Sequence, residues 1–192
     1  MGIETVAICE LALGCGFPTD LPQKLQHAWT RAGETIRITE WPVNEGGNWG
    51  WRLSDGYHSA REEYEHEGWV SLTGPDAIMV TLHKSAAKIC HPCRWGAFLS
   101  EDLIQRQLVS AMALVASVLG AKRLVLIPDS AYKCSEAMDG LFEGRSVDQI
   151  TNWLGKTCGP PAESLSSIYT ESEDSWEGDG YYILTVGPPL VS

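Results

Sequence analysis

The apolar residues of this chain fall into runs whose spacing predicts alternating strands and helices. Residues Glu4 to Leu13 are apolar and rich in β-formers, which favours a first strand. A helix is predicted from Asp20 to Gly33, because Asp20 and Gln23 have the spacing of a capping box and Gly33 is a typical helix stop. Its apolar positions recur every three or four residues, at Leu21, Leu25, Ala28 and Trp29.

The middle of the chain predicts a second set of strands and a long helix. Ile36 and Ile38 alternate with polar residues, which predicts a half-buried strand from Thr35 to Trp41. After a stretch rich in glycine, tryptophan and glutamate, further elements are predicted. These are a strand from Ala77 to Leu82, a Cys-rich connector, a helix that begins at the cap Ser100 and ends at Gly120, and a strand from Leu124 to Ile127.

The C-terminal third predicts helices and one strand. Pro128, Asp129 and Ser130 are typical of a helix start, and Ser146 with Gln149 forms a second capping-box spacing. Tyr181 to Val186 favours a last strand.

This order of elements predicts an α+β fold. The sequence β-α-β, insertion, β-α-β is that of a ferredoxin-like β-α-β-β-α-β core, and the alternative is an open mixed α/β sheet. We expect one domain over residues 1–192, with the core in residues 1–42 and 76–128, an inserted aromatic and acidic region in 43–75, and a C-terminal helical extension in 129–192.

The composition and charge of the chain limit the classes of function that we expect. The chain has 192 residues and a formal net charge of −11, which disfavours direct binding to nucleic acid. The N-terminus has no basic segment before its apolar run, and no apolar run reaches the roughly 18 residues of a transmembrane helix, so we expect no membrane contact and a cytoplasmic location. In that compartment the 6 cysteines are expected to be reduced.

The sharpest local motif is Cys90-His91-Pro92-Cys93. Over these four residues it resembles the Cys-x-Pro-Cys element of thioredoxin-like proteins, which implies thiol–disulfide exchange. Alternatively, Cys90, His91 and Cys93 could bind zinc with Cys158 or His83. A second paired ligand motif is missing, so the simpler interpretation is a tight loop with buried cysteines, no cofactor and no metal.

A mixture of tryptophans and carboxylates predicts a binding surface. Tryptophans in Gly-rich or acidic stretches have no periodicity that implies burial, and exposed aromatics ringed by polar groups are typical interface anchors. Clustered carboxylates steer a basic partner. The candidate partner-binding residues are Trp49, Trp51, Glu62, Glu63, Glu65, Glu67, Trp69, Glu173, Asp174, Trp176 and Glu177.

These features predict a non-catalytic acidic protein that caps or inhibits a basic protein. Its charge and size are those of immunity proteins that neutralise a toxin, a nuclease for example, and of viral inhibitors that imitate nucleic-acid charge. Two alternatives remain open. One is a small cytoplasmic enzyme with thiol-redox or zinc chemistry at Cys90-His91-Pro92-Cys93, and the other is a scaffold subunit that docks through its Trp-rich insertion.

Overall fold

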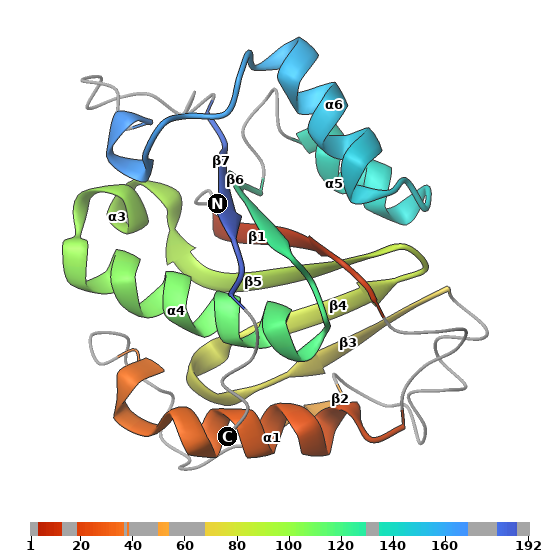
Figure 1. Ribbon diagram of the computed structural model, residues 1–192, viewed down its shortest axis with the longest axis vertical. Coiled ribbons are helices and arrows are strands. Elements are labelled where there is room, and N and C mark those ends of the chain that lie inside the picture. The colour runs from red at the N-terminus through yellow and green to blue at the C-terminus, as the bar shows by residue number, and fades with distance from the viewer. Residues whose placement is uncertain are drawn as a thin grey trace.

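The strands of the computed structural model form one antiparallel sheet with helices on both faces (Figure 1). The structure describes residues 4–12, 19–36, 38, 50–53, 68–129, 135–168 and 180–187. Within these ranges every strand pair is antiparallel, which confirms a mixed α+β fold and differs from the alternative of a sheet with mixed strand directions.

The described strands lie side by side in the order β2-β3-β4-β5-β1-β6-β7. Strand β1 pairs with β5 on one side and with β6 on the other. The bounds of the strands are β1 Glu4–Glu10, β2 Arg52–Leu53, β3 Trp69–Thr73, β4 Met79–His83, β5 Ala86–Arg94, β6 Arg123–Pro128 and β7 Tyr182–Thr185.

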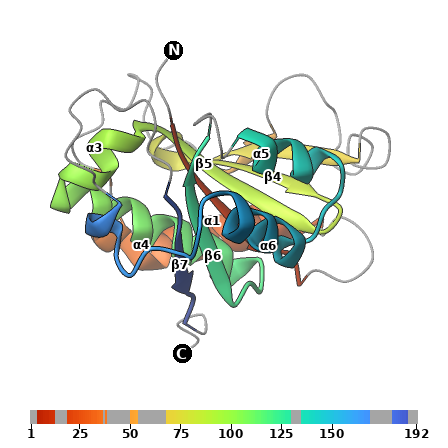
Figure 2. The same cartoon turned by 90° about the horizontal axis from the view of Figure 1, so that it is seen from above.

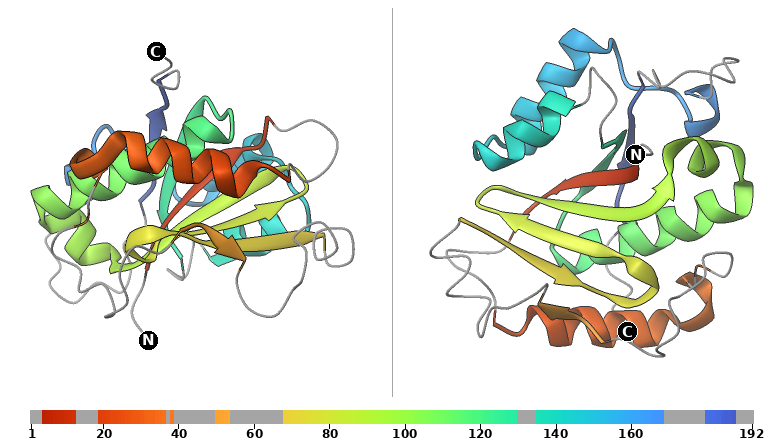
Figure 3. Two further views of the ribbon diagram at one scale, coloured as in Figure 1. Left: turned by 90° about the horizontal axis from the view of Figure 1, so that it is seen from below. Right: turned by 180° about the vertical axis from the view of Figure 1, so that it is seen from behind.

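The helices form two groups that the sheet separates (Figure 2, Figure 3). One group packs on the face that holds Ala7 and Cys9 of β1, and the other packs on the opposite face with Val6 and Ile8. The first group is α1 Leu21–Ala32, α3 Trp95–Ser100 and α4 Asp102–Val118, and the second is α5 Ser135–Phe142 and α6 Val147–Thr157. Because β1 is buried on both faces, its sequence is a continuous apolar run rather than an alternating one.

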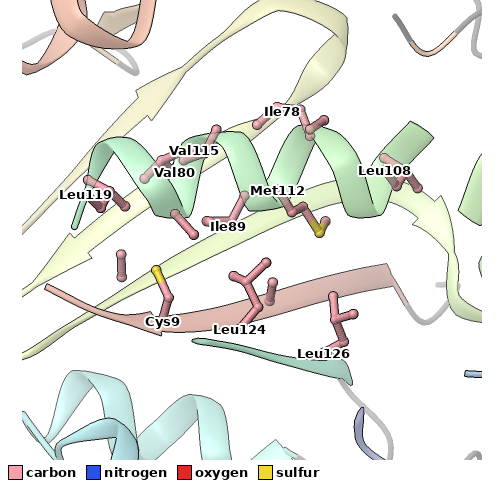
Figure 4. Packing of buried hydrophobic residues seen from close by; sticks show 14 of the residues in the cluster. Cys9, Ile78, Val80, Ile89, Leu108, Met112, Val115, Leu119, Leu124 and Leu126 are labelled. Atoms are coloured by element: carbon pink, nitrogen blue, oxygen red, sulfur yellow. The ribbon is translucent and has the colours of Figure 1, made fainter. Parts of the chain in front are cut away.

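The larger core lies between α4 and the sheet (Figure 4). Leu108, Met112 and Val115 recur at helical spacing and are fully buried against Val80 and Ile89 of the neighbouring strands. Full burial of one such side chain contributes about 1.5–3 kcal/mol. This confirms the predicted burial of the apolar helix, although that helix begins at Asp102, since Ser100 is the last residue of α3.

Two helix starts were predicted from capping boxes, and one of them forms. The backbone N–H of Gln149 donates to the Ser146 hydroxyl at 3.3 Å, and the backbone N–H of Ser146 donates to the Gln149 side chain at 2.8 Å. Asp20 makes no such cap and instead forms an ion pair with Lys24 at 2.8 Å.

The predicted strand from Thr35 to Trp41 differs from the structure. Its first residues belong to a 3-10 turn, Gly33–Ile36, that continues from α1. Ile36 and Ile38 are both buried in the larger core, whereas residue 37 and residues 39–41 lie outside the described ranges. The alternation of Ile36 and Ile38 therefore reflects burial in the larger core, and the segment starts as a 3-10 turn instead of a strand.

The Cys-rich connector is also different from its prediction. Its residues form the central strand β5, paired with both β4 and β1, followed by α3. Pro92 argues against a strand in the sequence, because proline has no backbone N–H to donate. The register of β5 against β1 shifts at this position, and a β-bulge of this kind accommodates a proline. Likewise, β3 lies within the predicted insertion 43–75 and is a regular strand of the sheet.

Two further predictions concern the C-terminal part and the membrane. The last strand is confirmed at Tyr182–Thr185, and α5 begins at Ser135 in the described part of the chain. No helix in the described ranges combines the length and the apolar character that crossing a bilayer requires.

Candidate functional site

Most residues of the predicted binding surface lie outside the described ranges. Of the candidates, the structure describes Trp51 and Trp69. Those outside the described residues are Trp49, Glu62, Glu63, Glu65, Glu67, Glu173, Asp174, Trp176 and Glu177.

Trp51 is a core residue, which corrects its expected exposure. Its side chain is 7% exposed and belongs to the larger core. The indole packs edge-to-face against Trp29 of α1, with ring centroids 5.8 Å apart, and it lies directly over Gly74. Burial between a helix and a sheet edge leaves no indole face for a partner.

Trp69 lies on the opposite face of the sheet and remains partly exposed. It is directly opposite His83 in the register of β3 and β4. The ring of Phe142, at the end of α5, meets both residues edge-on. Ring centroids are 6.4 Å apart for Trp69 and Phe142 and 4.9 Å apart for His83 and Phe142. We call Trp69, His83 and Phe142 the aromatic cluster.

The end of α5 fixes the position of Phe142. Gly144 has a φ of 77°, and the backbone N–H groups of Gly144 and Arg145 donate to the carbonyls of Leu141 and Gly140, which is the hydrogen-bond pattern of a Schellman helix end. The Ser85 hydroxyl, in the β4–β5 turn, contacts the carbonyl oxygens of Gly144 at 3.0 Å and Arg145 at 2.9 Å. The turn therefore ties the helix end to the sheet.

Phe142 is the most exposed large apolar side chain among the described residues, at 60%. It lies beside the apolar face of α5, whose buried residues are Ala137, Gly140 and Leu141. The helical spacing of those residues is a signal that would have placed Phe142 off the buried face. The pattern of tryptophans and carboxylates in the sequence gives no indication of Phe142, because that pattern includes no residue of α5.

His83 is buried beneath this exposed ring. Its side chain is 2% exposed, and its Nε2 atom has no hydrogen-bond partner in the described part of the chain. Burial, helped by the charge of Lys88, lowers the pKa of His83 to about 4. The imidazole is therefore neutral at physiological pH and adds no positive charge to the aromatic cluster.

Carboxylates line the exposed side of α5. Glu136 and Asp139 on α5 and Glu143 directly after it are exposed, and their spacing of three and four residues places them along one side. Glu143 forms an ion pair with Arg145 at 2.6 Å. Within the described ranges, Glu136 and Asp139 have no ion-pair partner. We use the name α5 surface for the set of Glu136, Asp139, Glu143, Trp69 and Phe142.

A basic residue borders the same region. Lys84 follows His83 in the β4–β5 turn, and a Cβ atom at Gly68 would lie 3.3 Å from the Lys84 side chain. In the sequence, the acidic residues Glu62, Glu63, Glu65 and Glu67 come immediately before Gly68. The α5 surface therefore combines exposed aromatic area with unpaired carboxylates and one neighbouring ammonium group.

The two cysteines of the Cys-x-Pro-Cys motif do not form one site. Cys90 packs in the core cluster with Val6 and Ile8, whereas Cys93 packs in the cluster on the other face of the sheet. Burial raises the pKa of each thiol to about 11. A thiol-exchange pair needs adjacent sulfurs and a lowered pKa, and this arrangement has neither.

The other candidate metal ligands are also separated. His91 is 1% exposed, and its Nδ1 atom accepts a hydrogen bond from the Cys93 backbone N–H at 3.0 Å. Cys158 is the C-cap residue that follows α6, and it is not part of β5. In the described part of the chain, no three His, Cys, Asp or Glu side chains are grouped in a way that could hold a metal ion.

Comparisons with protein-family models, with curated proteins and with solved structures give no match for this chain.

Proposed function

We propose that the chain is a non-catalytic acidic protein that binds a basic protein partner through the α5 surface. The observation that carries this proposal is the 60% exposure of Phe142, edge-on to Trp69 and flanked by carboxylates. The partner class is a basic protein, such as a toxin or a nucleic-acid-binding enzyme, which this chain would cap or inhibit.

The physical support comes from how interfaces gain affinity. A few aromatic residues contribute most of the binding energy when a partner desolvates them, and carboxylates around them favour a basic partner. The formal net charge of −11 adds long-range steering, which accelerates association at low salt. Phe142 supplies the apolar anchor, and Glu136 and Asp139 supply charges that no described residue neutralises.

We also propose that β1, β4, β5 and β6, with α1 and α4, form the expected ferredoxin-like core. Its support is the antiparallel order β4-β5-β1-β6 and the packing of both helices on one face. In this mapping β4, which overlaps the strand predicted at Ala77–Leu82, is the second core strand, and β5 is the third. Hydrogen exchange tests this proposal, because amides of β1 and β5 should exchange more slowly than those of the edge strands. Equal rates would contradict it.

The binding proposal is tested by affinity capture from the source cells. Immobilised wild-type chain is compared with Phe142→Ala and with a neutralised variant in which Glu136→Gln, Asp139→Asn and Glu143→Gln are combined. Both variants alter exposed side chains, so they should fold normally. We expect each to lose at least about 80% of a captured protein of basic isoelectric point, since removal of an anchor typically costs more than 1 kcal/mol.

Matched controls change the same chemistry away from the α5 surface. Leu103→Ala removes another exposed apolar side chain, at 41% exposure on α4. Glu101→Gln, Asp102→Asn and Glu163→Gln remove three exposed carboxylates elsewhere. The proposal is wrong if the controls and the α5 variants lower capture equally, or if the protein whose capture depends on Phe142 is acidic.

A further inference from the structure

The aromatic cluster is partly exposed to solvent and is not closed over by other described side chains on the Phe142 side. The planes of Phe142 and Trp69 are 84° apart and those of Phe142 and His83 are 88° apart, so neither ring is stacked in parallel on Phe142. With 60% of the side chain exposed, a planar group from outside can stack on Phe142. An aromatic face carries partial negative charge, which attracts cations.

An acidic group lies next to that face. Asp139 precedes Phe142 by three residues on α5, and residues at this spacing are neighbours on a helix surface, with Cβ atoms roughly 5–6 Å apart. Asp139 is exposed and has no ion-pair partner in the described ranges. By contrast, Glu143 is occupied by Arg145, so Asp139 is the carboxylate available to a cation on Phe142.

From these relationships we propose that the α5 surface accepts an arginine side chain of the basic partner, stacked on Phe142 between Trp69 and Asp139. The proposal rests on the binding function above and names the group that is recognised. Arginine fits better than lysine, because its planar guanidinium stacks on an aromatic face and still donates hydrogen bonds in its plane to a carboxylate.

The charges of the groups around Phe142 are compatible with a bound arginine. His83 lies under Phe142 and is neutral, since its pKa is lowered to about 4, so it does not repel a guanidinium at pH 7. Of the nearby basic residues, Lys84 lies in the β4–β5 turn, Lys88 lies on β5 close enough to lower the pKa of His83, and Arg145 is paired with Glu143. Lys84 carries an unpaired like charge in the described part of the chain, so Lys84→Ala should leave arginine binding unchanged or strengthen it.

The test uses three peptides of identical length in which glycine alternates with arginine, with lysine or with citrulline. Citrulline has the shape of arginine without its charge. Binding to the ¹⁵N-labelled full chain is followed by NMR titration, which also locates the contact. We expect the arginine peptide to bind about fivefold tighter than the lysine peptide, the citrulline peptide to bind weakest, and the shifts to centre on Trp69, His83 and Phe142.

Variants then separate stacking from charge. Phe142→Ala and Asp139→Asn should each weaken arginine binding about three- to tenfold, and Phe142→Tyr, which keeps the aromatic face, should preserve it. Leu103→Ala and Asp102→Asn are the matched controls and should have no effect.

The outcomes distinguish this inference from the function on which it rests. Equal binding of the arginine and lysine peptides, or shifts away from α5, overturns the arginine site. The binding function survives that result if capture of the basic protein still depends on Phe142 and the α5 carboxylates. Loss of that dependence in the capture experiment overturns the function itself, whichever peptide binds.

Discussion

The indole of Trp51 lies against the Cα of Gly74, so closely that a methyl group at residue 74 would come within 2.7 Å of three ring carbons. Gly74 joins β3 to the turn before β4, and Trp51 immediately precedes β2. The contact therefore joins two segments of the sheet edge to α1, through the packing of Trp51 on Trp29.

Gly74→Ala is expected to destabilise the protein. The φ of Gly74 is −111°, which alanine adopts freely, so the effect is steric and not conformational. Displacing a buried indole should cost about 1–3 kcal/mol in the free energy of unfolding, measured by urea denaturation. Gly96→Ala is the control, because nothing lies within 4 Å of its added methyl group. Equal stability of the two variants would contradict the contact.

Ser146→Ala should remove the N-cap of α6. The Ser146 hydroxyl accepts from the Gln149 backbone N–H at 3.3 Å, so its loss should cost about 1 kcal/mol of unfolding free energy. Ser110→Ala, at an exposed position inside α4, changes the same atoms without a cap and should be neutral or slightly stabilising. A neutral Ser146→Ala would show that the capping box does not stabilise α6.

Cys90 and Cys93 should resist alkylation in the native protein. Raising a thiol pKa from 9.0 to about 11 lowers the thiolate fraction at pH 8 about a hundredfold, and burial also blocks the reagent. Iodoacetamide labelling with peptide mapping should therefore modify the partly exposed Cys158 before either of them. Rapid labelling of Cys90 or Cys93, or a disulfide between them under mild oxidation, contradicts their placement on opposite faces.

Stability should fall as the pH decreases from about 6.5 to 4. His83 and His91 have pKa values lowered by burial to about 4, so the unfolded chain binds protons first and is favoured as the pH falls through this window. Each histidine contributes about 3 kcal/mol of stability that is complete above pH 6.5 and lost below pH 4.

The histidine contribution is checked with His83→Phe, which keeps a ring against Phe142. The unfolding free energy, measured by urea denaturation between pH 7 and pH 4.5, should decline less steeply with falling pH in this variant than in the wild type. The difference in slope should correspond to about one proton fewer taken up on unfolding. Identical slopes in the two proteins would show that His83 is not buried in its neutral form.

Some elements could be predicted because local sequence decides them. The apolar run of β1, the helical spacing of Leu108, Met112 and Val115, and the capping box at Ser146 each depend on neighbours within a few residues. The strand β5 could not be predicted in this way. Its lysine, histidine, proline and cysteines form no regular pattern, and it is a strand because β1 and β4 pair with it on both sides.

The two tryptophans that the structure describes among the candidate binding residues show the same limit. Trp51 and Trp69 occur in similar Gly-rich surroundings in the sequence, yet one is buried against Gly74 and the other meets Phe142 on the opposite face. Phe142 is 73 residues after Trp69 along the chain, and only the packing of α5 on the sheet brings their rings together.

The amino-acid sequence by itself determined the acidic charge, the α+β class and the elements whose apolar spacing is local, because these depend on composition and on contacts a few residues apart. The tertiary structure decided which aromatic rings are exposed, which carboxylates accompany them and that Cys90 and Cys93 lie on opposite faces. Strand register and helix packing set the side of the sheet on which each of these side chains lies, and both depend on residues distant in the chain.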